Sequence, residues 1–182
     1  MPGYIKQQIL DDVELKEARD LAASLDFYKV YQMYNLFDLE RADIQSHESY
    51  GFCKTLQEYS KLPQVIGLYF LRYIPNSFTR MHEDNNTDMT IVTLLEDQDL
   101  VGGHAIVQDT YAQKDRPSNQ ICNRGRHEIE KPPYGKKIIT DVLPMKRGES
   151  LIYGKDLTHG VSKVYEGSRL VLVSWFKRDS EG

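Results

Sequence analysis

The sequence predicts an α+β domain in which two helices precede a series of short strands that form a jelly roll or a similar barrel. Hydrophobic residues recur at helical spacing between Val13 and Leu25. From Val65 onward, the pattern changes to short segments rich in β-branched and aromatic residues and bounded by Gly, Pro, Asn or Asp. Helices followed by many short strands with turn signals are typical of this fold class.

The first helix is expected to begin beside Asp11 and Asp12, because acidic side chains stabilise the positive end of the helix dipole. A second helix is expected from Phe52 to Leu62, where Pro63 interrupts it. Between the two helices lies the aromatic-rich segment Phe27–Leu39, whose pattern is ambiguous.

The expected strands of the second part of the chain lie at Val65–Ile74, Thr90–Glu96, His104–Gln108, Lys136–Leu143, Ser150–Gly154 and Arg169–Phe176. The segment Asp109–Lys137 interrupts this series, because it is polar and contains several prolines. It is too long for an ordinary connection, so it is either a functional lid or a disordered insertion.

The chain of 182 residues suits one domain, with an N-terminal helical support at about residues 1–64 and a jelly-roll core at about residues 65–177. A formal net charge of −4 argues against nucleic acid as the default partner. Apolar runs are too short to span a membrane, and the N-terminus lacks the apolar stretch of a signal peptide. Cys53 and Cys122 lack metal-binding or redox spacing, so we expect reduced thiols in a cytoplasmic protein. The oligomeric state is not indicated.

The most informative pattern is an HxD pair, His82 and Asp84, followed far downstream by His159. Residues i and i+2 of an extended segment point to the same side, so the first imidazole and the carboxylate can converge on one ion. Two nitrogen ligands and one oxygen ligand suit Fe(II) with open coordination positions, and they lack the thiolates of a structural zinc site. Taken alone, the same three residues could also be a turn Asp and two surface His.

The surrounding sequence favours the metal site. The stretch from Met145 to Phe176, together with RYIPNSFTRMHEDN and the Gly102-Gly103 pair, resembles the catalytic core of the 2-oxoglutarate-dependent Fe(II) oxygenases. Within that superfamily it is most similar to the prolyl hydroxylases. The resemblance covers about residues 65–176 and implies a double-stranded β-helix, or cupin-like jelly roll, with N-terminal supporting helices.

The resemblance also implies roles for individual residues. His82, Asp84 and His159 would bind iron, and Arg169 would hold the distal carboxylate of 2-oxoglutarate through its planar, two-pronged guanidinium. Tyr73 matches a family tyrosine that contacts the cosubstrate, although a core tyrosine explains it nearly as well.

Three further positions complete the expected cosubstrate pocket. Thr90 or Thr93 could supply a hydroxyl near the cosubstrate carboxylate, whereas the tyrosine that many prolyl hydroxylases use on this strand is replaced by Leu94. Trp175 is expected to back the metal pocket or to serve as a core residue.

The implied activity is hydroxylation of an unactivated C–H bond with Fe(II), 2-oxoglutarate and O2, and with ascorbate as a candidate reductant. Asp84 favours hydroxylation, because halogenating family members lack this carboxylate. Trp175 stands where nucleic-acid dealkylases carry a second arginine, which argues against that activity. A prolyl residue in a protein or peptide is the first choice of substrate, and a free amino acid or small metabolite is the alternative. A non-catalytic jelly-roll binding module is a third reading.

Overall fold

The computed structural model describes residues 3–109, 127–131 and 136–179. Its N-terminal part contains strands as well as helices: β1 (Tyr4–Gln8), α1 (Asp12–Ser24), β2 (Tyr28–Met33), β3 (Leu36–Asp43), the 3-10 turn η1 (His47–Ser49) and α2 (Gly51–Ser60). The later part is made of strands: β4 (Gln64–Tyr73), β5 (Phe78–His82), β6 (Met89–Gly102), β7 (Ala105–Asp109), β8 (His127–Lys131), β9 (Lys136–Leu143), β10 (Glu149–Tyr153), β11 (Thr158–Val161) and β12 (Val164–Lys177).

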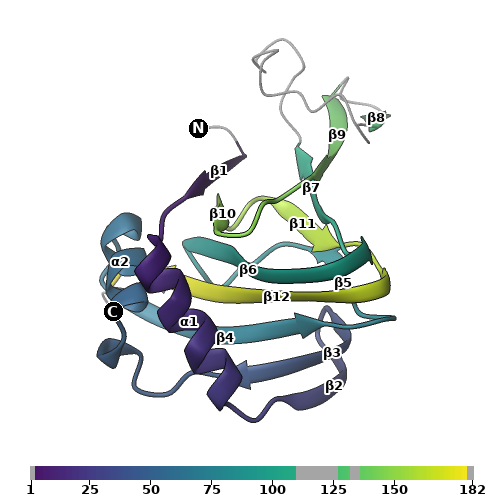
Figure 1. Cartoon of the computed structure of the whole chain (residues 1–182). Helices are drawn as coiled ribbons and strands as arrows, with labels where there is room; N and C mark the ends of the chain where they lie inside the picture. The colour runs from purple at the N-terminus through teal and green to yellow at the C-terminus, as the bar shows by residue number, and fades with distance from the viewer. Residues whose placement is uncertain (1–2, 110–126, 132–135, 180–182) are drawn as a thin grey trace.

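All the strands belong to one antiparallel sheet that curls on itself (Figure 1). The strand order is β1-β10-β6-β12-β4-β3-β5-β11-β7-β9-β8, and β2 pairs with β3 beside this path. The sheet is consistent with the jelly-roll core that the sequence predicts. It also shows that the N-terminal region is more than a helical support, because β1 extends the sheet beyond β10 and β3 joins β4 to β5.

Both expected helices are present, and the start of the first has a clear local cause. The Asp11 carboxylate accepts a hydrogen bond from the backbone N–H of Glu14 at 2.8 Å, and the Glu14 carboxylate accepts one from the backbone N–H of Asp11 at 3.0 Å. This reciprocal capping box satisfies two of the free N–H groups at the helix start. α1 therefore begins where its sequence pattern predicts.

The two helices cover one face of the sheet (Figure 1). Phe52 and Leu56 of α2 belong to the same core cluster as Phe70 of β4 and Leu172 and Phe176 of β12. The free thiol of Cys53 lies in this cluster too, and burial raises the pKa of that thiol to about 11. Cys122 and most of the Asp109–Lys137 insertion lie outside the described residues.

Alternate residues of the central strands face the other side of the sheet. Tyr69, Leu71 and Tyr73 of β4 lie directly opposite Val173, Val171 and Arg169 of β12, and all of these residues are buried. Because successive strand residues point to opposite faces, the residues between them pack under the helices. The sheet thus has one face for the helical core and one concave face for a site. No helix in the described ranges is long and apolar enough to cross a membrane.

Gly160 of β11 allows a close approach to β5, and its replacement tests this packing. A Cβ atom at position 160 would lie 2.7 Å from Met81 Sδ and 2.8 Å from the Thr79 carbonyl oxygen. We expect Gly160→Ala to lower the free energy of unfolding by about 1–3 kcal/mol, because the extra atom pushes the two strands apart. Urea unfolding followed by circular dichroism measures the change.

Gly154→Ala is the matched control, since its Cβ would have Asp88 O at 3.8 Å as its nearest neighbour. Equal stability of the two variants would contradict the close β5–β11 packing.

Candidate metal centre

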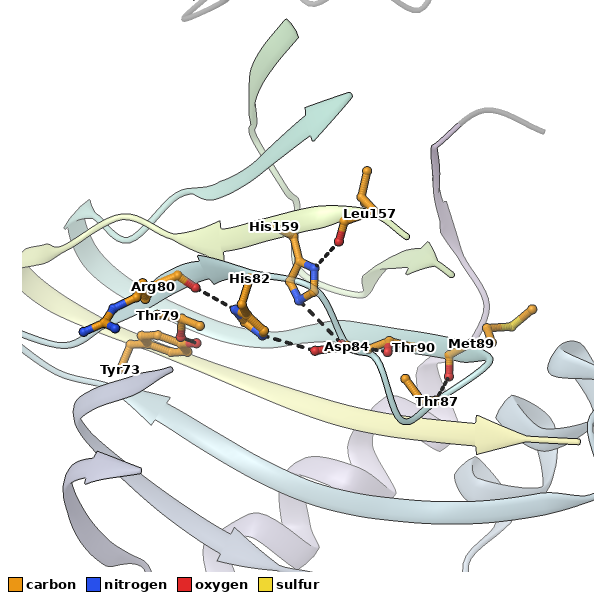
Figure 2. Close-up of polar contacts among 10 residues, drawn as sticks. All are labelled: Tyr73, Thr79, Arg80, His82, Asp84, Thr87, Met89, Thr90, Leu157 and His159. Carbon is orange, nitrogen blue, oxygen red and sulfur yellow. Dashed lines mark hydrogen bonds and ion pairs between the residues drawn. The ribbon is translucent and has the colours of Figure 1, made fainter. Parts of the chain in front are cut away.

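The pairing of β5 with β11 brings the two predicted histidines together. His82 is the last residue of β5, His159 is the second residue of β11, and the two are direct partners in the strand register. Asp84 follows β5 after one intervening residue. One potential ligand atom from each of the three side chains lies within 4.8 Å of the others. The structure therefore assembles the three residues that the HxD pattern singles out (Figure 2).

Both imidazoles are oriented by backbone carbonyls. His82 Nδ1 lies 2.6 Å from the carbonyl oxygen of Arg80, and His159 Nδ1 lies 2.9 Å from that of Leu157. A carbonyl oxygen only accepts hydrogen bonds, so each Nδ1 is the donor. Nε2 of each ring is then turned toward the centre, 3.1 Å from Asp84 Oδ1 for His82 and 3.5 Å from Asp84 Oδ2 for His159. Metal-binding histidines are typically held by such contacts.

The Asp84 carboxylate is held in its charged form. Burial alone would raise its pKa, but hydrogen bonds from His159, His82 and Thr90 outweigh burial and keep the pKa of Asp84 well below its usual range. Burial likewise acts to lower the pKa of His82, and the hydrogen bond to Asp84 reverses that effect and raises it. The cluster combines one anionic oxygen donor with two nitrogen donors, which is a set that suits a divalent transition metal.

Arg169 is a buried cation on the same face of the sheet. It is 3% exposed, and burial lowers the pKa of its guanidinium. Within the described residues, Nη1 has no hydrogen-bond partner, and Nη2 contacts only the sulfur of Met145, at 3.9 Å. Burying a charge costs free energy unless the charge is paired. An anionic ligand that reached this guanidinium would supply the pairing.

A small cavity of about 70 Å³ connects the metal cluster to Arg169. Tyr73 lies beside it, with the guanidinium carbon of Arg169 5.4 Å from its ring centroid. The Tyr73 hydroxyl shares a hydrogen bond of 2.6 Å with Thr79 Oγ1, and burial raises the pKa of Tyr73. Both hydroxyl-bearing residues line the cavity. Tyr73 therefore lines the cavity beside Arg169, and its contact with a cosubstrate stays a prediction, whereas Thr79 was not predicted from the sequence.

The two threonines predicted as alternatives lie on opposite sides of β6. The Thr90 hydroxyl donates a hydrogen bond of 2.8 Å to Asp84 Oδ2, so it meets the metal cluster (Figure 2). Thr93 shares a hydrogen bond of 2.7 Å with Ser150 and is not among the cavity-lining residues that the structure describes. Leu94 belongs to the buried cluster on the site face of the sheet.

A second, larger pocket of about 440 Å³ opens beside the metal cluster. Trp175 lines both spaces and also packs against the buried cluster of β4 and β12. Its indole N–H is buried and has no hydrogen-bond partner in the part of the chain that the structure describes. Arg41 also lines the larger pocket, and its guanidinium is paired with Asp43 at 2.8 Å and lies 3.9 Å from the Tyr69 ring centroid.

The solved structures that are similar to this chain include members of the 2-oxoglutarate and Fe(II) oxygenases. A family member from Burkholderia pseudomallei is 16% identical, with a TM-score of 0.67 over 97% of this chain and 86% of that one. A prolyl-4-hydroxylase from Pseudomonas putida is 16% identical, with a TM-score of 0.64 over 99% and 95% of the two chains. HygX from Streptomyces hygroscopicus, bound to nickel, 2-oxoglutarate and hygromycin B, is 13% identical, with a TM-score of 0.63 over 98% and 84%.

At the level of the sequence, no protein-family model and no curated protein matches this chain. The structural similarity at these low identities shows a shared fold. It confirms the double-stranded β-helix that the sequence resemblance implies, and the proteins that share it include the prolyl hydroxylases.

Replacing one imidazole tests the metal centre directly. We expect His82→Ala to weaken Co(II) binding to the metal-free protein by more than about 100-fold, because losing a ligand costs more than losing a residue that only orients one. Calorimetric titration measures the affinity. His104→Ala removes an exposed histidine outside the cluster and should bind Co(II) as the unmodified protein does. Equal binding by both variants would contradict the assignment.

Proposed function

We propose that this protein is an Fe(II)- and 2-oxoglutarate-dependent oxygenase that hydroxylates an unactivated C–H bond. The observation that carries the proposal is the convergence of His82, Asp84 and His159 beside a small cavity that also has Arg169 among its lining residues. A metal cluster and a buried cation without a hydrogen-bonded anion among the described residues line one cavity, and they match the two ends of a metal-bound 2-oxo dicarboxylic acid.

The residues fit iron through their donor types and orientation. His82, Asp84 and His159 would hold the ion by three ligands and leave its other positions open. The fixed Nδ1–H donors of both histidines present Nε2 to the centre without further rearrangement. Bound iron and 2-oxoglutarate would together supply the chemistry with O2 that oxidises the substrate and yields succinate and CO2.

The residues fit 2-oxoglutarate because the Arg169 guanidinium has no anionic hydrogen-bond partner among the residues that the structure describes. A carboxylate that reaches the guanidinium could accept two parallel hydrogen bonds, which is the strongest geometry for this pair. The hydroxyl pair of Tyr73 and Thr79 lines the same cavity and offers further donors. Apolar side chains such as Leu71, Val171 and Val173 line the space as well and limit the access of water.

The substrate is proposed to be a prolyl residue in a protein or peptide. The 440 Å³ pocket beside the metal cluster offers the apolar and aromatic surfaces of Met33, Leu36 and Trp175 to a compact ring. Asn85 and Asn86 in the same wall can hydrogen-bond to a peptide backbone. The structural similarity to the Pseudomonas putida prolyl-4-hydroxylase supports this choice.

A free amino acid or other small metabolite is the second candidate. The pocket volume lies within the range of small-molecule sites, about 300–1,000 Å³. The structure of HygX with hygromycin B shows that the fold accommodates a small molecule.

Turnover with candidate substrates tests the proposal. We expect the iron-loaded protein to convert 2-oxoglutarate to succinate, and a proline-containing peptide to gain one oxygen atom in mass spectrometry. Oxidation of free proline or another metabolite instead of peptides would favour the second candidate. Succinate formation that survives in Asp84→Ala would contradict the proposed centre, and a protein without any turnover would support a binding module.

Arg169 is expected to act on the cosubstrate and not on the metal. Arg169→Ala should raise the KM for 2-oxoglutarate by about 10-fold or more, because it removes a charge-assisted hydrogen-bonded pair of about 1.5–3 kcal/mol. Initial rates of succinate formation measure this change, and Co(II) affinity should stay the same. Arg147→Ala is the control, since Arg147 is exposed and paired with Asp97. An unchanged KM in Arg169→Ala would refute its role.

A further inference from the structure

The backbone leaves the Asp84 side chain to be positioned by other residues. Asp84 lies after the end of β5, outside any strand, whereas both histidines sit within paired strands. A carboxylate on a short side chain can rotate unless neighbouring groups hold it. The orientation of this proposed ligand therefore depends on the side chains around it.

Two hydroxyl groups approach Asp84 from neighbouring strands. Thr90 of β6 and Tyr153 of β10 are direct partners in the antiparallel register, so their side chains lie on the same face of the sheet. The Thr90 hydroxyl is fully buried and donates to Asp84 Oδ2 at 2.8 Å. This leaves Oδ1 as the oxygen nearer to His82 Nε2, at 3.1 Å.

Tyr153 contacts both sides of the cluster. Its ring centroid lies 4.2 Å from that of His159, and the residue is only 3% exposed. A side-chain hydrogen bond connects Tyr153 with Asp84. Because a carboxylate only accepts hydrogen bonds, the phenol O–H of Tyr153 is the donor in this contact. Its ring also limits the rotation of the His159 imidazole.

We propose that Thr90 and Tyr153 are positioning residues of the metal centre, whose hydroxyl groups hold the Asp84 carboxylate in the orientation that completes the three-ligand set. The inference rests on the proposed function, because it assigns these hydroxyls to a metal ligand. Thr90 and Tyr153 form a cross-strand pair. Through this pair, β6 and β10 orient Asp84, although Asp84 belongs to neither strand.

Metal affinity of the protein without cosubstrate tests the pair. Thr90→Val keeps the shape of the side chain and removes the hydroxyl, and Tyr153→Phe keeps the ring that packs on His159. We expect each variant to bind Co(II) about 10-fold more weakly in calorimetric titration, which is the usual effect of losing a group that orients a ligand. Thr90→Ser restores a hydroxyl and should return the affinity close to that of the unmodified protein.

Ser174→Ala is the matched control, since it removes a buried hydroxyl that donates to the Ile91 carbonyl on the neighbouring strand. Its Co(II) affinity should be unchanged, and the melting temperature of each metal-free variant reports folding separately. Unchanged affinity in both Thr90→Val and Tyr153→Phe would overturn the inference, as would a Thr90→Ser variant as weak as Thr90→Val. If the unmodified protein itself bound no Co(II), the proposed metal centre would fail instead.

Discussion

The site depends on one constraint, the antiparallel pairing of β5 with β11, which sets His82 directly opposite His159. Strand partners lie about 4.5–5.5 Å apart, so two imidazoles on the same face can share an ion in this register. A slip of one residue would turn one ring to the other face of the sheet. Gly160 keeps the two strands close, because a side chain there would meet Met81 and the Thr79 carbonyl.

Because successive strand residues point to opposite faces, one face of the sheet packs in the core and the other lines the site. Phe70 and Leu172 of the paired strands β4 and β12 pack under the helices, while Tyr73 and Arg169 of the same strands face the cavity. Burying the Arg169 cation costs free energy, and the apolar core on the helical side offsets this cost. A carboxylate ligand would form an ion pair with Arg169. The free energy of binding would therefore include the gain from pairing this buried charge.

The local sequence pattern was enough to predict both helices and most strands of the core, and it singled out the three residues of the metal cluster only together with the resemblance to the 2-oxoglutarate-dependent Fe(II) oxygenases. It did not identify Thr79 or Tyr153, because their contacts depend on which strands become neighbours and in what register. Thr90 and Thr93 show the limit clearly. Their sequence contexts are equivalent, yet only Thr90 faces the site, together with Val92 and Leu94, whereas Thr93 shares its hydrogen bond with Ser150. The ambiguous segment Phe27–Leu39 forms β2 and the first half of β3, which pair as a hairpin, and β3 is tied to β5 through the long-range partners of Leu36 and Phe37.

The central claim is that the metal cluster and Arg169 act as one site for a metal-bound 2-oxo acid. Calorimetric titration of 2-oxoglutarate without oxygen, into the metal-free and the Fe(II)-loaded protein, tests it most directly. Fe(II) is expected to strengthen the binding of 2-oxoglutarate to the unmodified protein. The same addition of Fe(II) should leave binding to Asp84→Ala unchanged. Binding of equal strength with and without Fe(II) in the unmodified protein would contradict the central claim.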